Sequence, residues 1–326
     1  MKGSHRIIVE TKKIRYDFTV KRNITILTGD SASGKTVLID MIREYRRYGT
    51  DSGVFLSCDC ECRTIDDENW MRQMEEISGS IIFIDEGNRF LPSREFAELV
   101  LKSDNYFVLA VREKLPMLPY SINEIYGFRK SGKFNEAKQT YNEIYHLYGE
   151  ISGQSVISPA TVITEDSNSG YEFFSKLAGQ KNITCISANG KSNVISMLDS
   201  RDNKEGICLV IADGAAFGSE IRDVSEYLNV EEKVVLYAPE SFEWLLLSTN
   251  AIPNVNVSSI LKRPENYIES SQFASWERYF TALLVNRTQR DPVWAYSKKK
   301  LPEAYYSPKI IVEIKKQMKL IAWGKG

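Results

Sequence analysis

The sequence GDSASGKT at residues 29–36 constrains this chain more than any other feature. It follows the apolar run ITIL at residues 24–27 and precedes a stretch in which apolar residues recur with helical spacing from Val37 to Ile42. A G-x-x-x-x-G-K-[ST] loop between a strand and a helix is a P-loop, whose backbone N–H groups curl around phosphate oxygens. The motif therefore predicts a parallel α/β sheet with a nucleotide at its edge.

The loop and the start of its helix supply the predicted phosphate ligands. The partial positive charge of the helix N-terminus favours an anion there. Lys35 is expected to reach the β- and γ-phosphates and to act in catalysis, while the Thr36 hydroxyl is expected to ligate Mg²⁺. The predicted cofactor-binding residues are Gly29, Asp30, Ser31, Ala32, Ser33, Gly34, Lys35 and Thr36.

Two further strands are expected to end at the same edge. The apolar run at residues 81–84 leads into Asp85 and Glu86. Strand carboxyl ends form the ligand edge of a parallel sheet, so Asp85 is expected to hold Mg²⁺ and Glu86 to act as base on the attacking water. Arg112 ends the next predicted strand, at residues 105–112. It either stabilises charge on the γ-phosphate or is an exposed arginine without a role, and the sequence leaves both open.

The alternation of apolar runs and helical patterns predicts an α/β fold with two sheets. Strands that are apolar on both faces are typical of parallel sheets covered by helices on both sides. The predicted segments are a P-loop ATPase domain at residues 1–130, a linker or helical hairpin at 131–158, a second, smaller, Rossmann-like α/β domain at 159–250, and a mainly helical C-terminal extension at 251–326.

Three of the five cysteines, Cys58, Cys60 and Cys62, lie in the run SCDCEC. A zinc site needs a fourth ligand and usually has C-x₂-C spacing. Alternate residues of a strand share one face. We therefore favour a strand, extending over residues 53–58 and beyond, with the thiols on one face. The only histidines are His5 and His146, which argues against a His-rich metal site.

Charge and hydropathy exclude some classes of protein. The net charge of −1 provides no global field for nucleic acid or membrane, so the basic residues near both ends are either solvated surface or a local patch. No apolar run approaches the roughly 20 residues that span a bilayer, and no signal-peptide core is present. We expect a cytoplasmic protein without a membrane partner.

The P-loop, the acidic strand end and Arg112 resemble those of the additional-strand P-loop ATPases, a group with AAA+ ATPases, STAND ATPases and phage zot-like proteins. The opening residues also resemble an ABC or structural-maintenance-type ATPase. However, no LSGGQ-type signature is present, and residues 37–79 leave no room for an ABC helical subdomain. The absence of an N-K-x-D motif after the acidic strand favours ATP over GTP.

The second predicted domain resembles TOPRIM domains. TVITE ends in Glu165, ICLVIAD ends in Asp213, and PESFEW carries Glu240 and Glu243. The resemblance implies that Glu165, Asp213 and Glu240 hold Mg²⁺ or Mn²⁺ for phosphodiester hydrolysis. It departs from the family at Ala215, where a D-x-D pair would have its second aspartate. A Rossmann-like domain with merely polar strand ends is the alternative.

The combination of a P-loop ATPase and a TOPRIM-like domain resembles the OLD-family nucleases and related phage-defence systems. Two functions follow from that resemblance. In the first, ATP hydrolysis controls a metal-dependent nuclease that acts on foreign nucleic acid. In the second, ATP drives assembly, and a degenerate, non-nuclease second domain binds a partner. Either function implies a homo-oligomer or a hetero-complex.

Overall fold

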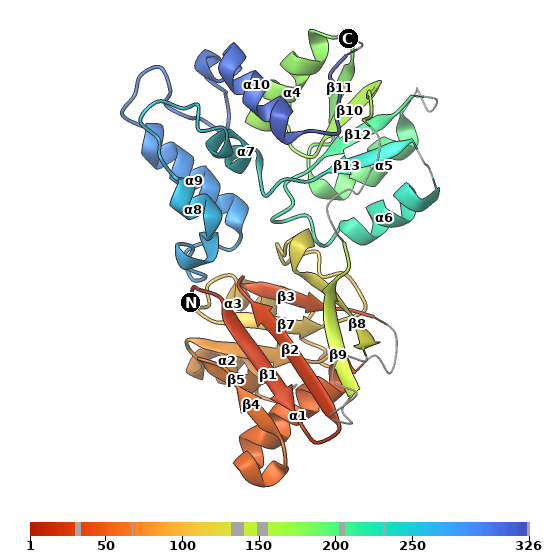
Figure 1. The fold of residues 1–326 in the computed structure, drawn as a ribbon, viewed down its shortest axis with the longest axis vertical. Coiled ribbons are helices and arrows are strands. Elements are labelled where there is room, and N and C mark those ends of the chain that lie inside the picture. Colours follow the sequence, from red (N-terminus) through yellow and green to blue (C-terminus); the bar gives the residue numbers. More distant parts are fainter. Residues whose placement is uncertain are drawn as a thin grey trace. The chain divides into compact units, whose positions relative to one another are not determined.

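The computed structural model describes residues 1–29, 34–66, 68–131, 140–148, 156–201, 206–230 and 233–324 (Figure 1). The chain divides into two compact units. Unit 1 comprises Met1–Tyr148 and Arg263–Ser275, and unit 2 comprises Gly149–Lys262 and Trp276–Gly326. The returning segment of unit 1 is tied to its sheet, because Asn23 donates hydrogen bonds to the carbonyls of Ser270 and Phe273.

Nine strands of the described part of unit 1 form one sheet in the order β4-β1-β2-β9-β8-β3-β7-β6-β5. They are β1 (His5–Glu10), β2 (Ile14–Val20), β3 (Ile24–Leu27), β4 (Phe55–Ser57), β5 (Glu61–Thr64), β6 (Ser80–Ile84), β7 (Tyr106–Ala110), β8 (Ile125–Ser131) and β9 (Thr140–His146). The helices are α1 (Lys35–Tyr48), α2 (Trp70–Glu76) and α3 (Arg94–Val100), with the short 3-10 segments η1 (Gly49–Ser52), η2 (Ile122–Glu124) and η5 (Pro264–Asn266).

The central strands of this sheet are the continuous apolar runs of the sequence. Every residue of β3, β6 and β7 is buried. These strands, together with β5 and β8, pair in parallel, as expected for strands covered on both faces. The predicted α/β class is confirmed, but the sheet is mixed, because β1 pairs antiparallel with β2 and β4, and β9 pairs antiparallel with β8.

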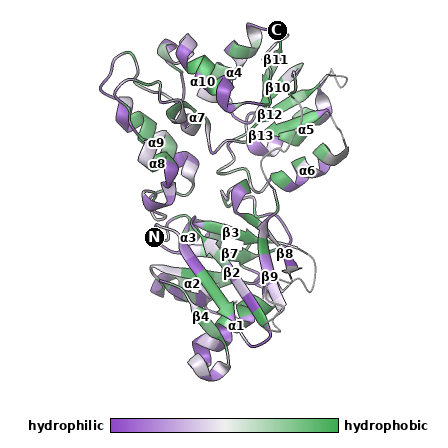
Figure 2. Ribbon diagram, in the orientation of Figure 1, coloured by the Kyte–Doolittle hydropathy of each residue, from purple (hydrophilic) through white to green (hydrophobic). Residues whose placement is uncertain are grey.

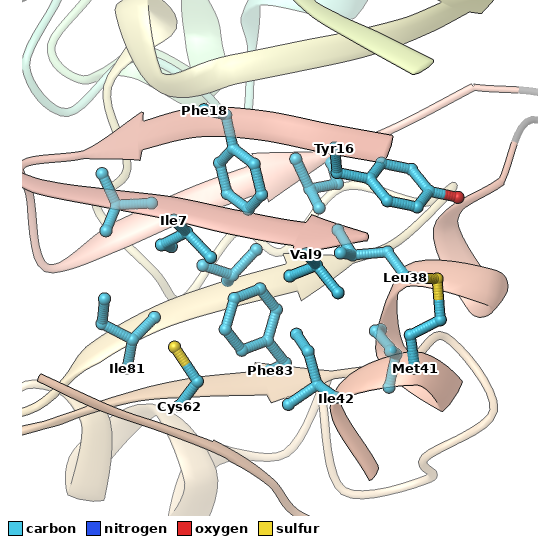
Figure 3. Close-up of a cluster of buried hydrophobic side chains, with 14 of the residues drawn as sticks. Ile7, Val9, Tyr16, Phe18, Leu38, Met41, Ile42, Cys62, Ile81 and Phe83 are labelled. Atoms are coloured by element: carbon cyan, nitrogen blue, oxygen red, sulfur yellow. The ribbon is translucent and has the colours of Figure 1, made fainter. Parts of the chain in front are cut away.

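The sheet of unit 1 curls around the apolar face of α1. β4 and β5 stand at opposite ends of the strand order, yet only residues 58–60 join them, a segment that reaches about 14 Å at most. The ring of Phe18 on β2 meets that of Phe83 on β6 edge to face, at 6.4 Å between centroids. Leu38 and Ile42 of α1 fill the space beside them (Figure 3). Val37, expected on this face, is exposed instead.

Two predictions about this unit are wrong. Part of the segment 131–158 forms a strand, β9, instead of a linker or helical hairpin. β9 runs antiparallel to β8 and parallel to β2, so pairing on both sides satisfies its backbone and buries Tyr141 and Asn142. The strand predicted at 53–58 also does not extend through the cysteines. It ends at Ser57 beside β1, and β5 pairs with β6 instead.

Unit 2 contains a second parallel sheet, in the order β11-β10-β12-β13 among its described residues. Figure 2 shows its strands as predominantly hydrophobic. The strands are β10 (Thr161–Thr164), β11 (Thr184–Ser187), β12 (Cys208–Ile211) and β13 (Val234–Tyr237). The helices are α4 (Ser169–Gly179), α5 (Val194–Ser200), α6 (Ile221–Val230), α7 (Phe242–Ser248), α8 (Ser258–Lys262), α9 (Trp276–Thr288) and α10 (Pro308–Gln317). A second α/β sheet followed by helices was expected here.

Among the described residues, no helix combines the length and the apolar character needed to cross a bilayer.

Phe83→Ala tests whether the curled core of unit 1 carries its stability. Phe83 is fully buried, so its loss should lower the free energy of unfolding by about 3–5 kcal/mol, as large-to-small core changes do. Phe55→Ala is the matched control, because Phe55 is 54% exposed and should change stability by less than about 0.5 kcal/mol. Urea denaturation of the full chain measures both, and similar losses would contradict this packing.

Candidate functional site

The start of α1 is built around Gly34. Its φ is 106°, a left-handed conformation that side chains other than glycine rarely adopt. A Cβ atom there would lie 2.9 Å from the Tyr16 hydroxyl oxygen and 3.1 Å from Asn142 Nδ2. The Tyr16 hydroxyl donates a hydrogen bond of 2.8 Å to the Gly34 carbonyl. β2 and β9 therefore hold the entrance of the helix, and they do so only with glycine at this position.

Burial keeps the Tyr16 hydroxyl in its donor form, since it raises the pKa of Tyr16 to about 12. Asp30, Ser31, Ala32 and Ser33, predicted to line the loop, lie outside the described residues. Gly29, at the other end of the loop, has a φ of 135°. Both ends of the predicted loop thus have the backbone conformation that a glycine permits.

Lys35 and Thr36 form the first turn of α1. The Lys35 side chain is buried, and its ammonium group donates to the Gly29 carbonyl across the base of the loop. Thr36 is exposed, and the first turn contains no acidic residue. A helix N-terminus that carries a lysine and has no acidic residue in its first turn favours an anion.

The strand order brings Asp85, Glu86 and Arg112 to the carboxyl edge beside β3. β7 lies between β3 and β6, so Arg112, two residues beyond β7, is adjacent to the end of β6. Its Nη2 donates to Glu86 Oε1 at 2.6 Å. The second oxygen, Glu86 Oε2, is buried and has no hydrogen-bond partner among the described atoms. A carboxylate oxygen held in this way can accept a proton or a hydrogen bond from a ligand.

Asp85 precedes this pair and is oriented by its own turn. Its Oδ1 accepts the Glu86 N–H at 2.9 Å, and its carbonyl accepts the side-chain amide of Asn88 at 2.9 Å. Asp85 is half-buried. The edge of unit 1 therefore joins a hydroxyl and a carboxylate, which are hard ligands suited to Mg²⁺, with a lysine, a second carboxylate and an arginine.

In unit 2 the structure brings Glu165 and Asp213 together, as their strand-end positions predict. β10 and β12 are parallel neighbours, with Thr164 opposite Ile211. The Asp213 N–H donates to Glu165 Oε2 at 2.9 Å, and Asp213 Oδ1 accepts the Phe242 N–H at 3.0 Å. Both acids line a cavity of about 20 Å³, which has room for about one water molecule.

Burial dominates the electrostatics of these two acids. Burial, together with the negative charge of Glu277, raises the pKa of Glu165 to about 7 and that of Asp213 well above its usual range. Two lysines oppose this rise: Lys191 lowers the pKa of Glu165, and Lys298 lowers that of Asp213. The ammonium of Lys298 belongs to the same cluster. Its Nζ donates to Glu277 Oε1 at 2.7 Å and lies 4.0 Å from Glu243 Oε1. The surroundings of the two acids therefore favour their protonated forms, and the lysines oppose that effect.

The sequence interpretation offered Glu240 and Glu243 as further acids, assigned the metal to Glu240, and missed Glu277. The acids with the largest effects on Asp213 include Glu277 on α9 and Glu243 on α7. Glu240 is half-buried and contributes its carbonyl to the Ala215 N–H, and it does not line the cavity. Of the two acids in PESFEW, Glu243 in the first turn of α7 is the buried one, and nothing in the sequence connects the distant Glu277 with Asp213.

A scan against protein-family models matches none of them, and no curated protein is detectably similar to the chain.

Glu165→Gln tests the raised pKa of this half-buried acid through the pH dependence of stability. The pKa of Glu165 is raised from 4.5 to about 7 in the folded protein. The unfolded chain therefore loses this proton first, and stability falls as pH rises from about 4.5 to 7, by at most about 3 kcal/mol. Glutamine removes that loss, so the variant should be more stable than the wild type at about pH 8 and similar at about pH 5.

Thermal unfolding in the presence of a chelator measures the effect. The control is Glu226→Gln on α6, where the glutamate side chain is 68% exposed. Its pH profile should match that of the wild type. A Glu165→Gln profile parallel to the wild type across this range would show that Glu165 does not titrate as described.

Proposed function

We propose that unit 1 binds and hydrolyses ATP with Mg²⁺. The observation that carries the proposal is the strand order β3-β7-β6, which gathers the helix with Lys35, the Asp85–Glu86 pair and Arg112 at one edge. This order agrees with the resemblance to additional-strand P-loop ATPases. The preference for ATP over GTP rests on the sequence alone.

The residues divide the chemistry between them. The Lys35 ammonium would neutralise the β- and γ-phosphates, and Thr36 with Asp85 would hold Mg²⁺, which draws charge from the phosphate oxygens. Glu86 Oε2, buried and without a partner among the described atoms, would take a proton from the attacking water. Arg112 positions Glu86 through the 2.6 Å contact and can stabilise charge on the transferred phosphoryl group.

For unit 2, we propose that nucleotide hydrolysis controls a TOPRIM-like nuclease that acts on foreign nucleic acid in the cytoplasm, within a homo-oligomer or a hetero-complex. The adjacency of Glu165 and Asp213 supports a divalent cation between strand ends. When deprotonated, the pair could hold one Mg²⁺ or Mn²⁺ ion.

A second candidate is favoured by different observations. The cavity beside the acids is only about 20 Å³, Lys298 already pairs with Glu277, and Ala215 is buried where the family pattern has an acid. In that case unit 2 is a degenerate domain that binds a partner, and ATP governs assembly.

Substitutions at the nucleotide edge should separate binding from turnover. Lys35→Ala removes the charge between the phosphates and should lower both ATP affinity and hydrolysis, the latter by about 10²–10³-fold. Glu86→Gln should retain ATP binding and lose about 10²–10⁴-fold in turnover, since only the base is lost. Phosphate release and calorimetric titration measure the two quantities.

The matched control is Glu98→Gln, because Glu98 also pairs with an arginine, Arg94, but on the exposed surface of α3. It should hydrolyse ATP like the wild type. Wild-type turnover in Glu86→Gln would refute the base assignment, and a wild type that neither binds nor hydrolyses ATP would refute the proposed function.

Asp213→Asn distinguishes the two proposals for unit 2. The nuclease proposal requires wild-type protein to cleave plasmid DNA, linear DNA or transfer RNA with Mn²⁺, and the variant to lose cleavage while ATP hydrolysis persists. The control, Asp223→Asn on α6, should retain both activities. If the wild type cleaves none of these substrates while hydrolysing ATP, the partner-binding candidate is supported.

A further inference from the structure

The cysteine-rich turn of unit 1 lies where the two ends of the curled sheet approach each other. Cys58 follows β4, Cys60 precedes β5, and Asp59 lies between them. His5, the first residue of β1, faces this turn, and its Nδ1 lies 2.8 Å from Asp59 Oδ1. Two segments that are distant in sequence thus bring thiols, an imidazole and a carboxylate together.

The ligand atoms of this group lie close enough together to contact one metal ion. The Sγ atoms of Cys58 and Cys60 are 3.6 Å apart, and two sulfurs bound to one zinc ion at 2.3 Å lie about 3.8 Å apart. One ligand atom from each of His5, Asp59 and Cys60 lies within 4.8 Å of the others. Cys58 Sγ is also 3.6 Å from Asp59 Oδ1. Cys58 thus lies beside this group through Cys60 and Asp59, and its side chain would have to rotate toward His5 to complete a set of four ligands.

We propose that Cys58, Cys60, His5 and Asp59 bind a zinc ion. Thiolate and imidazole ligands select zinc over the hard cations Mg²⁺ and Ca²⁺, and a site with four protein ligands is typical of structural zinc. The proposal is independent of ATP hydrolysis and uses no residue of the nucleotide edge.

Two arguments against a zinc site arose from the sequence, the lack of a fourth ligand and the C-x-C spacing, and the structure answers both. The missing fourth ligand comes from β1, and the tight C-x-C spacing is accommodated because both cysteines lie in a turn rather than in a strand. Cys62 differs from them. It lies in β5 and is buried near Ile81 and Phe83 (Figure 3).

A metal at this position would stabilise the curled sheet by cross-linking its two ends. β4 pairs only with β1, and β5 only with β6, among the described strands. The bound ion would link the β4–β5 turn to the start of β1, closing the curl that encloses α1. Structural zinc contributes directly to folding free energy, so its removal should lower the stability of unit 1.

The test is metal analysis of the full chain, purified without a metal-binding tag after growth with zinc. Plasma mass spectrometry should find about one zinc ion per wild-type chain. Cys60→Ser and His5→Gln should each lose zinc affinity by more than about tenfold, since even outer-shell changes cost about 10–100-fold. Cys185→Ser is the matched control. Cys185 is a half-buried free thiol on β11 of unit 2, and its variant should retain the metal.

Cobalt substitution of the wild-type protein provides a second test that does not depend on the folding of any variant. Wild-type protein stripped of metal and given Co²⁺ should show thiolate-to-cobalt charge transfer and the visible bands of a tetrahedral ion. Wild-type protein that takes up neither zinc nor cobalt would overturn the proposal. So would unchanged zinc in both ligand variants, or a Cys58–Cys60 disulfide in freshly purified protein.

Discussion

The parallel pairing of β3, β7 and β6 is the constraint on which the chemistry of unit 1 depends. Because all three strands run in one direction, their carboxyl ends share one edge, and each continues into a polar residue or the loop before α1. The contact between Arg112 and Glu86 requires β7 beside β6. An antiparallel insertion would send Arg112 to the opposite edge and leave Glu86 without its partner. The side-chain contacts at this edge therefore depend on which strands are neighbours in the sheet.

Support for the loop comes from strands outside that parallel core. Tyr16 on β2 and Asn142 on β9 approach Gly34 so closely that a Cβ atom would clash. The same curl of the sheet encloses α1, and Phe18 and Phe83 meet across it. The curl of the sheet around α1 therefore both packs the core and positions Lys35 at the start of the helix. The proposed zinc ion would act on it from the far side, at the β4–β5 turn.

The nucleotide edge and the acidic strand ends were predictable, because each is determined by a short continuous stretch of sequence. The strand–loop–helix pattern around Lys35 and the strand ends at Glu86 and Asp213 are continuous in sequence. β9 was not predictable, since its strand is stabilised by pairing with β2 and β8 rather than by local pattern. The same holds for Glu277 and His5. Each meets its cluster through tertiary folding, and single-sequence patterns do not report that proximity.

Both units place acidic residues at the carboxyl ends of neighbouring parallel strands, but the surroundings of these acids differ. At the edge of unit 1, Thr36 is exposed and Asp85 and Glu86 are half-buried, as a ligand site requires. At the edge of unit 2, Asp213 is also half-buried, but desolvation and the neighbouring acids raise its pKa well above its usual range, so a proton competes with a cation there. This contrast is why the nucleotide site is the central claim and the nuclease the subordinate one.

A crystal structure of the full chain with Mg²⁺ and a non-hydrolysable ATP analogue tests that central claim most directly. The account predicts the γ-phosphate within hydrogen-bond distance of Lys35 Nζ, Mg²⁺ shared by Thr36 and Asp85, and a water molecule on Glu86 Oε2. A nucleotide bound elsewhere, or a triphosphate at this edge with Glu86 turned away from the γ-phosphate, would contradict it.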